Sequence, residues 1–503
     1  MRNHEEFRRH LDQVLTLAPE ATAIYVHDIS YSWEQLAGSI HAIDNIFGSL
    51  SLPIGSQVGV IAHNNAATVA ALLAVTRAGH CFITFNPMHS GAKIGAELES
   101  LRLPLLIAAG DDIDDESLMA AVDRNGNAVL QATDTATGVG LELRAGMAFT
   151  GFCAPLEGVA VMMQSSGTTG TPKRIHLKYP GLLHPISDQM PEAGSSAVQI
   201  KDTPVIVANP LAHIGGLFHT LKAIIDARPQ ILMDRFDVKI WSDAVQRHQL
   251  KLGHLVPATV KMILDEDVPA EKLASLKAVI CGSAALRPDI QQSFEARYAV
   301  PLLVVYGATE FAGGVAGWSF PLHREFMPAK LGSVGRAFPG TELRVVDATS
   351  GEELPSGKEG ILEIRSVQSA SGAAAWVPTT DIAILDDESF LWVRGRADAA
   401  INRGGFKILP TDVESVLQTH PDIEEAVVVA LDDDRLGQVP AALLQPTTGT
   451  DELDLEAVAS LAREGLAAYQ VPVRFLVARS IPRNASLKPD LPAIRALLES
   501  HTQ

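Results

Sequence analysis

A run of hydroxyl and glycine residues between two apolar segments has the composition of a loop that binds a phosphate chain. Gln164 is followed by Ser-Ser-Gly-Thr-Thr-Gly-Thr-Pro, and Lys173 closes the run. Glycines let backbone N–H groups turn toward a ligand, the hydroxyls add short donors, and the ammonium adds positive charge. The segments 159–163 and 174–179 both read as strands, so the loop is predicted to join two strands, whereas the common phosphate loop opens a helix. By composition alone, a flexible polar hairpin remains the alternative.

Four further segments carry charged or glycine residues in short, defined patterns. Residues 305–310 read Val-Tyr-Gly-Ala-Thr-Glu, and Thr-Thr-Asp at 379–381 is followed by Arg-Gly-Arg-Ala-Asp at 394–398. Residues 402–414 begin Asn-Arg-Gly-Gly-Phe-Lys, and residues 482–488 read Pro-Arg-Asn-Ala-Ser-Leu-Lys. In this order, and with the first loop, these segments resemble the motifs of the adenylate-forming superfamily, which includes acyl-CoA and aryl-CoA ligases, luciferases and the adenylation domains of peptide synthetases. The resemblance extends over nearly the whole chain.

The resemblance implies a reaction in two halves. A carboxylate attacks the α-phosphorus of ATP, which releases pyrophosphate and leaves an acyl-adenylate, and the thiol of coenzyme A then takes the acyl group. Because both reactants of the first half are anions, its barrier is largely electrostatic and positional. Two unit charges about 4 Å apart interact by roughly 4 kcal/mol at an effective dielectric constant of about 20. One lysine and one Mg²⁺ ion can therefore change the rate greatly, and the expected ligands are ATP, Mg²⁺ and coenzyme A.

The resemblance also assigns roles at the nucleotide. Lys488 would bind the reacting oxygens, Asp381 would accept hydrogen bonds from the ribose hydroxyls, and Glu310 would hold Mg²⁺, which prefers hard oxygen ligands. The residues predicted to be catalytic are Lys488, Glu310, Thr309 and His213, with Glu310 as the metal ligand. The residues predicted to bind ATP are Ser165, Ser166, Gly167, Thr168, Thr169, Gly170, Lys173, Gly282, Ser283, Ala284, Tyr306, Gly307, Ala308, Asp381 and Arg396.

A second group of predictions concerns the second half-reaction, in which the thiol of coenzyme A takes the acyl group. Asp398 is the predicted hinge, about which the C-terminal domain would rotate after the adenylate has formed, because one site must serve two half-reactions with different occupants. Thr380 and Leu487 depart from the family pattern, which usually has glycine at both positions. The residues predicted to line a channel for coenzyme A are Arg403, Gly404, Gly405 and Phe406.

The acid pocket is predicted around a histidine in an apolar run. His213 resembles the residue that gates the carboxylate in the family, although a histidine in such a run is commonly a core residue. The segment 209–219 contains no aspartate for an α-amino group, and small residues such as Gly317 predict a roomy, mostly apolar cavity. We therefore expect an uncharged aryl, cyclic or medium-chain acid. The residues predicted for this pocket are His213, Ile214, Gly215, Gly216, Gly313 and Gly314.

The bulk properties narrow the class of protein. A formal net charge of −19 gives no attractive field for nucleic acid or an anionic membrane. The three cysteines are far apart and lack metal-ligand spacing, which is typical of a reduced cytoplasmic protein. We expect neither a secretory signal nor a membrane span, because the first residues and the longest apolar stretch are too polar. The oligomeric state stays open, with a homodimer among the expected states.

The pattern of elements predicts an α/β fold. Strand-like runs such as 58–62 and 105–108 alternate with helix-like stretches such as 66–77, as in parallel sheets covered by helices. The region 340–365 predicts a small antiparallel subdomain. With 503 residues, more than one domain is expected. We predict a large N-terminal domain, 1–397, and a small mobile α+β domain, 398–503, which includes a helix at 455–468.

An ATP-dependent acid–CoA ligase is the leading interpretation, and three alternatives remain at this point. An acyl-AMP ligase would pass the acyl group to the pantetheine arm of a carrier protein. A luciferase-like oxygenase would consume oxygen. A degenerate nucleotide-binding regulatory protein would release no pyrophosphate with any acid.

Overall fold

The structure, a computed structural model of the chain, describes residues 3–148, 151–164, 173–189, 198–450, 452–484 and 486–500. The described residues form two compact units. The larger extends to Thr341 and includes Arg365–Ala375, and the smaller contains Glu342–Ile364 and the chain from Trp376 onward. More than one domain was expected for a chain of this length. The predicted domain boundary at Asp398 stays a prediction.

The larger unit is built around a seven-stranded sheet with the order β7-β6-β5-β3-β4-β8-β9. The five inner strands run parallel, and β7 and β9 pair antiparallel at the two edges. Parallel strands that are buried on both faces have continuous apolar sequences, which is how β3 and β5 could be predicted. The strands are β3 (Gln57–Ile61), β4 (Cys81–Phe85), β5 (Leu105–Ala108), β6 (Ala128–Thr135), β7 (Gly138–Ala145), β8 (Val159–Gln164) and β9 (Arg174–Lys178).

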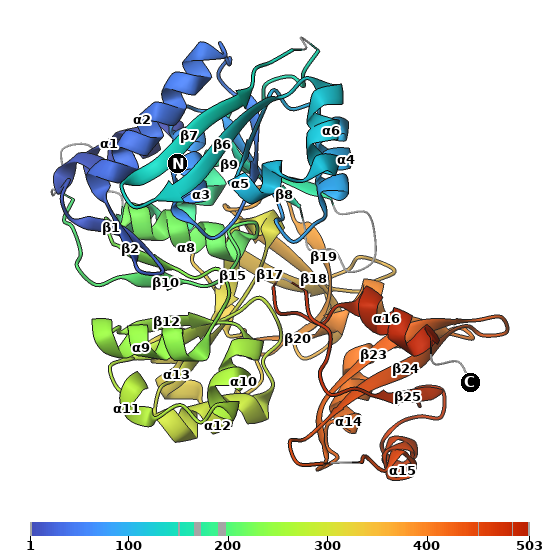
Figure 1. Cartoon of the computed structure of the whole chain (residues 1–503). Coiled ribbons are helices and arrows are strands. Elements are labelled where there is room, and N and C mark those ends of the chain that lie inside the picture. The colour runs from blue at the N-terminus through green and yellow to red at the C-terminus, as the bar shows by residue number, and fades with distance from the viewer. Residues whose placement is uncertain are drawn as a thin grey trace. The chain divides into compact units, whose positions relative to one another are not determined.

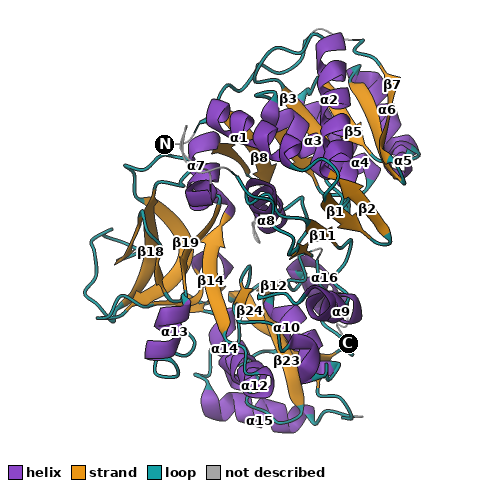
Figure 2. Ribbon diagram, turned by 90° about the vertical axis from the view of Figure 1, so that its left-hand side faces the viewer, coloured by secondary structure: helices purple, strands orange, loops and turns teal. Residues whose placement is uncertain are grey.

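Helices cover both faces of this sheet (Figure 2). Successive side chains of a strand point to opposite faces. Accordingly, Leu105 and Ile107 of β5 lie in one core with α2 and α3, whereas Leu106 and Ala108 lie in another with α4 and α6. The helices of these cores are α2 (Trp33–Ser49), α3 (Ala66–Arg77), α4 (Gly91–Leu101), α6 (Glu116–Asn125) and α8 (Ile214–Ile225).

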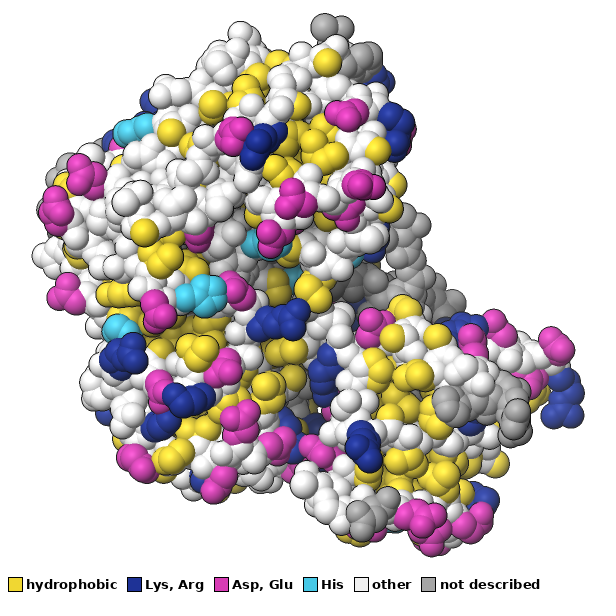
Figure 3. Space-filling model, viewed as in Figure 1, with side chains coloured by type: hydrophobic (Ala, Val, Ile, Leu, Met, Phe, Trp, Pro, Cys, Tyr) yellow, Lys and Arg dark blue, Asp and Glu magenta, His cyan; other side chains and the backbone are white. Residues whose placement is uncertain are grey.

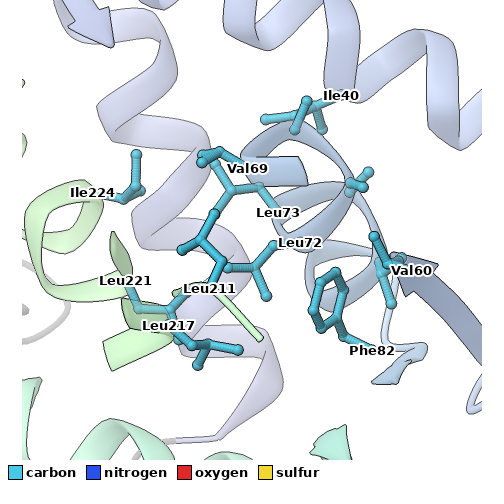
Figure 4. Packing of buried hydrophobic residues seen from close by; sticks show 14 of the residues in the cluster. Ile40, Val60, Val69, Leu72, Leu73, Phe82, Leu211, Leu217, Leu221 and Ile224 are labelled. Atoms are coloured by element: carbon cyan, nitrogen blue, oxygen red, sulfur yellow. The ribbon is translucent and has the colours of Figure 1, made fainter. Parts of the chain in front are cut away.

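Helix α3 is buried along its length, and its sequence explains where it begins. Asn65 caps the first turn by accepting a hydrogen bond from Thr68 N, and the Asp134 carboxylate accepts from Ala66 N and Ala67 N. Alanine and leucine favour the helix, and the small side chains allow neighbouring elements to approach closely. Figure 4 shows Leu72 of α3 in the same apolar cluster as Leu217 of α8. This cluster therefore packs α8 against α3.

Two smaller sheets complete the larger unit, with the orders β10-β11-β1-β2 and β12-β13-β14-β15-β16. In the five-stranded sheet β12, β13 and β14 are parallel, and β15 and β16 are antiparallel additions. A separate apolar core joins this sheet to α9 (Val238–His248), α10 (Pro257–Asp265) and α12 (Pro288–Tyr298). The strands of the two sheets are β1 (Thr22–Val26), β2 (Ile29–Ser32), β10 (Val205–Val207), β11 (Gln230–Leu232), β12 (Leu252–Leu255), β13 (Ala278–Cys281), β14 (Leu302–Ala308), β15 (Gly313–Gly317) and β16 (Arg336–Ala337). The remaining helices are α1 (His4–Leu17), α5 (Gly110–Ile113), α7 (Tyr179–Leu183), α11 (Ala270–Leu273) and α13 (Phe320–Phe326).

The smaller unit contains a four-stranded sheet, β17-β18-β19-β20, followed by an α+β fold (Figure 1). Strands β17 and β18 confirm the strands predicted within 340–365. In the α+β fold, Ala442 and Leu444 of β24 pack with α14 and α15, and Ala441 and Leu443 pack with α16. The elements are β17 (Thr341–Val346), β18 (Glu359–Ser366), β19 (Val377–Leu385), β20 (Leu391–Arg396), β21 (Ile401–Arg403), β22 (Phe406–Ile408), α14 (Pro410–Leu417), β23 (Ile423–Asp433), β24 (Gly437–Pro446), α15 (Leu455–Gly465), β25 (Arg474–Val477) and α16 (Leu491–Ser500).

Most predicted elements are present, with boundaries shifted by a few residues, and the end predicted for one helix is wrong. Helix α15 ends at Gly465 rather than at residue 468. A glycine is a poor helix residue, and a Cβ at this position would lie 2.7 Å from Val416 of α14, so close packing favours both the glycine and the early end.

The surface carries charges of both signs. Figure 3 shows acidic and basic side chains interspersed over the drawn face, with apolar atoms exposed among them. Within the described ranges, no helix is both long enough and apolar enough to cross a membrane.

Candidate active site

The predicted site residues that the structure describes fall into two sets, one in each unit. The set in the larger unit comprises Lys173, His213, Ile214, Gly215, Gly216, Gly282, Ser283, Ala284, Tyr306, Gly307, Ala308, Thr309, Glu310, Gly313 and Gly314. The set in the smaller unit comprises Asp381, Arg396, Asp398, Arg403, Gly404, Gly405, Phe406 and Lys488. In the larger unit, β9 contacts the turn after β14, and α8 contacts β15, so the elements that carry the first set meet one another.

The predicted phosphate loop joins the antiparallel strands β8 and β9, and Gln164 lies opposite Arg174 at their ends. Residues 165–170 lie outside the described residues, and Lys173 is exposed. Glu97 of α4 holds both strand ends, because its Oε2 accepts a hydrogen bond from Gln164 Nε2 at 2.7 Å and from Arg174 Nη2 at 2.6 Å. No sequence motif indicates Glu97, because it lies 67 residues from Gln164 and belongs to no local pattern.

The motif at 305–310 lies at the end of β14 and in the short 3-10 turn after it. Strand β14 pairs with β15 so closely that a Cβ on Gly307 would overlap the backbone of Gly313. Only glycine allows this approach. The Thr309 and Glu310 side chains that follow are partly buried. Strand pairing therefore fixes the start of the turn that carries the predicted magnesium ligand.

The segment 282–284 follows β13 beside the motif on β14. A Cβ on Gly282 would lie 3.1 Å from the Val305 carbonyl oxygen, so the two strand ends are adjacent. Ser283 adopts φ 73° in the left-handed region, and Ser283 and Ala284 are exposed. The turn therefore exposes small side chains next to Tyr306, as the predicted adenine contact requires.

His213 is the N-cap residue of α8, and it is partly buried. The turn that precedes it is closed by a hydrogen bond from His213 N to Pro210 O at 2.9 Å. A Cβ on Gly216 would overlap the carbonyl groups of Pro210 and Asn209. Gly216 is therefore required for the helix to pack on this turn, and it leaves no free space.

The expectation that glycines leave a roomy cavity is also wrong on β15. Phe338 fills the space where side chains of Gly314 and Gly317 would lie, at 3.2 Å from a Cβ on Gly314 and closer still at Gly317. At Gly313 the nearest atom to such a Cβ belongs to Phe218, at 3.7 Å. These glycines allow aromatic rings to pack against the strand, which a sequence alone cannot distinguish from an open pocket.

Asn64, three residues after the end of β3, is a buried residue that no sequence motif indicates. Its Nδ2 donates to Asn209 O at 3.0 Å and to Met233 O at 2.9 Å, and its Oδ1 accepts from Leu211 N at 2.8 Å. Asn64 thus satisfies three backbone groups and ties down the turn that leads to His213. Its partner Asn209 is 145 residues away, so no local pattern could have indicated this role.

In the smaller unit, three predicted residues from separate segments come together. Asp381 of β19 lies directly opposite Arg396 of β20. Lys488 is partly buried. Burial lowers the pKa of its ammonium, the charge of Arg396 lowers it further, and the charge of Asp381 raises it, so Lys488 lies close enough to interact with both residues. The cluster joins two cations and one carboxylate, the charges that the predicted ATP contacts need.

The predicted hinge residue is bound to one of these cations. Arg396 Nε donates to Asp398 Oδ1 at 2.8 Å, and Arg396 Nη2 donates to Asp398 Oδ2 at 2.6 Å. Such a two-point contact fixes both groups more firmly than a single hydrogen bond. The role of Asp398 as a hinge stays a prediction.

The lysine loop is a tight turn that Asn484 organises. Its Oδ1 accepts from Ser486 N and Lys488 N, and Asn484 N donates to Lys488 O at 2.9 Å. Within this turn Leu487 adopts φ 58°, in the left-handed region that favours glycine. This is the position at which the family usually has glycine. The backbone keeps the glycine-like conformation although the residue is leucine.

We expect Leu487→Gly to be more stable than Leu487→Ala by about 1 kcal/mol. Both variants lack the leucine side chain, but only glycine adopts this φ without strain, and its greater unfolded-state entropy offsets part of the gain. Urea unfolding of the two variants measures the difference. Equal stabilities would show that the turn relaxes away from the left-handed conformation.

The glycine loop places an aromatic ring on the surface. Gly404 and Gly405 have φ 57° and 92°, so both use the conformational freedom of glycine. Phe406 is 56% exposed and stacks on Tyr469, with centroids 4.6 Å apart. Arg403 Nη1 donates to Tyr469 O at 2.8 Å, which holds the two segments together. The channel for coenzyme A at these residues stays a prediction.

Comparisons with known proteins agree with the motifs. Residues 11–372 match the AMP-binding enzyme family, and residues 412–488 match the AMP-binding enzyme C-terminal domain. The chain is 29% identical over 488 residues to 2-succinylbenzoate–CoA ligase of Bacillus pumilus (strain SAFR-032), with 94% of each chain covered. It is 27% identical over 517 residues to indoleacetate–CoA ligase of Aromatoleum aromaticum (strain DSM 19018 / LMG 30748 / EbN1), with 99% of each covered.

The fold agrees as well. O-succinylbenzoate coenzyme A synthetase from Bacillus subtilis, solved in complex with ATP and magnesium ion, matches with a TM-score of 0.76 at 24% identity, over 97% of this chain and 99% of that one. This likeness confirms the predicted α/β architecture with a small C-terminal α+β part. Because the first family match alone covers most of its residues, the chain belongs to the AMP-binding enzyme family, and the adenylate-forming resemblance is confirmed.

Proposed function

We propose that the chain is an ATP-dependent carboxylic acid–CoA ligase that forms an acyl-adenylate and releases AMP and pyrophosphate. The observation that carries this proposal is the cluster of Asp381, Arg396 and Lys488, which three separate segments build within one unit. The activities named for the relatives, on 2-succinylbenzoate and indoleacetate, support an aryl acid as the substrate class.

In this proposal the residues of the chain position two anions and neutralise their charge. Lys488 and Arg396 bring positive charge to the oxygens that react, and Asp381 accepts hydrogen bonds from the ribose. Bound magnesium would add positive charge at the phosphates. Glu310 fits such an ion because Mg²⁺ keeps water and phosphate oxygens as ligands and needs only one or two carboxylates from a protein.

The two halves of the proposed reaction can be tested separately. Pyrophosphate release is measured with ATP, Mg²⁺ and a panel of aryl and alkyl acids, and thioester formation is then measured with coenzyme A or with a loaded carrier protein. We expect pyrophosphate with aryl acids and thioester with coenzyme A. Absence of pyrophosphate with every acid would overturn the proposal, and thioester formed only on the carrier protein would replace coenzyme A as the acceptor.

Glu97→Gln is expected to raise the KM for ATP about tenfold while the KM for the acid changes little. The neutral amide keeps the shape of the side chain but loses the charge-assisted bond to Arg174, and such bonds contribute about 1.5–3 kcal/mol. The base of the predicted phosphate loop would then be less firmly held. Pyrophosphate release at varied ATP measures the effect.

The matched control for this variant is Glu99→Gln, which changes an exposed residue on the same helix. It should leave both KM values unchanged. If Glu97→Gln behaved like this control, Glu97 would have no part in ATP binding.

We also propose a cytoplasmic location, which the three free cysteines, Cys81, Cys153 and Cys281, support. Cell fractionation tests it. Self-association into a homodimer remains a proposal from the sequence, and light scattering at several protein concentrations would decide it.

A further inference from the structure

The loop that carries Lys488 contains a strained residue, and an arginine of the same loop contacts the carbonyl group of that residue. Leu487 has φ 58°, a conformation that glycine adopts freely and that costs free energy for leucine. Arg483 Nη1 donates to Leu487 O at 3.0 Å. Because Lys488 follows directly in the chain, a change in the backbone at Leu487 would displace the lysine side chain.

The same guanidinium connects the loop to the sheet of the α+β fold. Arg483 Nη2 donates to Glu425 Oε2 of β23 at 2.5 Å, and the two side chains are 29% and 25% exposed. Glu425 lies 58 residues away in the chain, so this contact holds the loop from outside. Charge-assisted hydrogen bonds are stronger than neutral ones, and partial burial reduces their screening by salt. The carboxylate therefore fixes the position of the guanidinium.

Other hydrogen bonds close the loop upon itself. Asn484 bonds to residues of its own turn, including Lys488, and Asp490 N donates to Pro482 O at 2.8 Å where the two ends of the loop meet. These contacts define the shape of the loop. The contacts of Arg483 instead join the strained residue to β23, so they also define where the loop lies on the body of the unit.

We propose that Arg483 is a positioning residue: anchored by Glu425, it holds Leu487 in the left-handed conformation and thereby orients Lys488 for adenylate formation. This inference rests on the proposed function, in which Lys488 brings positive charge to the oxygens that react. A displacement of about 1 Å at a catalytic group can reduce a rate about a hundredfold, so the conformation of the preceding residue has a direct effect on catalysis.

The test begins with Arg483→Met, which keeps an unbranched side chain but donates no hydrogen bond. We expect the rate of exchange of labelled pyrophosphate into ATP, measured in the presence of acid, to fall about tenfold or more. Thioester formation from a supplied acyl-adenylate and coenzyme A should stay nearly unchanged, because Lys488 acts in the first half of the proposed reaction. Unchanged thioester formation also shows that the variant is folded.

The second step combines Arg483→Met with Leu487→Gly. Glycine adopts the left-handed conformation without strain, so the turn no longer depends on the guanidinium, and exchange should recover to within about threefold of the wild type. Leu487→Ala is the matched control, because alanine also lacks the leucine side chain but keeps the cost of this φ. Combined with Arg483→Met, it should leave the loss in place. Each change at Leu487 is also measured alone as the reference.

Arg479→Met is the control for the removal of an arginine. Arg479 is an exposed residue of the same unit, a few residues before the loop. This variant should keep the wild-type rate of exchange. An equal loss in Arg479→Met would show that any reduction of positive charge in this part of the chain has the same effect, which would overturn the inference.

The remaining outcomes distinguish this inference from the function on which it depends. Wild-type exchange in Arg483→Met, or an equal loss of both half-reactions, overturns the positioning role alone. A loss that Leu487→Gly does not rescue, or that Leu487→Ala rescues equally well, does the same, because the conformation at Leu487 would then not be the link. Failure of the wild-type protein to release pyrophosphate with any acid would overturn the ligase and this inference with it.

Discussion

Replacing Lys488 by alanine is expected to reduce adenylate formation about a thousandfold. The reaction brings two anions together, and a unit charge about 4 Å from the reacting oxygens contributes roughly 4 kcal/mol at an effective dielectric constant of about 20, which corresponds to about three powers of ten in rate. Exchange of labelled pyrophosphate into ATP in the presence of acid measures this half-reaction. Thioester formation from a supplied acyl-adenylate and coenzyme A should be nearly unaffected.

The control for this variant is Lys358→Ala, an exposed lysine of the same unit. Equal loss of both half-reactions in Lys488→Ala would contradict the assignment. The pH dependence gives a second check, because the pKa of Lys488 lies below that of an ordinary lysine. Adenylate formation should decline as pH rises through this lowered pKa, and the residual activity of the alanine variant should lack that decline.

Replacing Asn64 by alanine is expected to lower the free energy of unfolding by about 2–4 kcal/mol. The change leaves two carbonyl groups and one N–H unpaired in the interior, and each unpaired group costs about 1–3 kcal/mol before relaxation. The turn before His213 should loosen as well, so the KM for the acid should rise more than the KM for ATP. Urea unfolding and steady-state kinetics measure the two effects.

The control variant Asn127→Ala distinguishes a loss of stability from a loss of positioning of the turn at 209–213. Asn127 is 1% exposed and donates to the backbone oxygen of Leu103, and among the described residues no hydrogen bond joins its side chain to the turn at 209–213. Its loss should lower stability and leave the KM for the acid unchanged. If Asn64→Ala also left that KM unchanged, Asn64 would support the fold without positioning the site.

The elements that the sequence predicts well are those whose burial follows a local rule. Strands β3 and β5 are covered on both faces, so their segments are continuously apolar, and α3 is a run of alanine and leucine that begins with a capping residue. The end of α15 could not be predicted, because it depends on contact between Gly465 and Val416 of another helix.

The residues of the candidate site also fall into two groups, those that a local motif indicates and those that it does not. Ordered motifs led to Asp381, Arg396 and Lys488, and the structure brings these residues together. Glu97 and Asn64 carry no local signal, because their hydrogen bonds connect segments 67 and 145 residues apart. Glycine is ambiguous in a sequence, since Gly314 suggests an empty pocket but actually accommodates the ring of Phe338.

In the ion pair within residues 396–398, the Asp398 carboxylate competes with any anionic ligand for the Arg396 guanidinium. Asp398 occupies two adjacent N–H groups of the Arg396 guanidinium. An anion that requires the same edge of the guanidinium must displace that carboxylate, so its apparent affinity falls by the strength of the internal contact. Thermodynamic linkage makes the effect reciprocal. Loss of the Arg396–Asp398 contact removes a restraint on the backbone at Asp398, so binding of such a ligand and loss of this restraint are coupled.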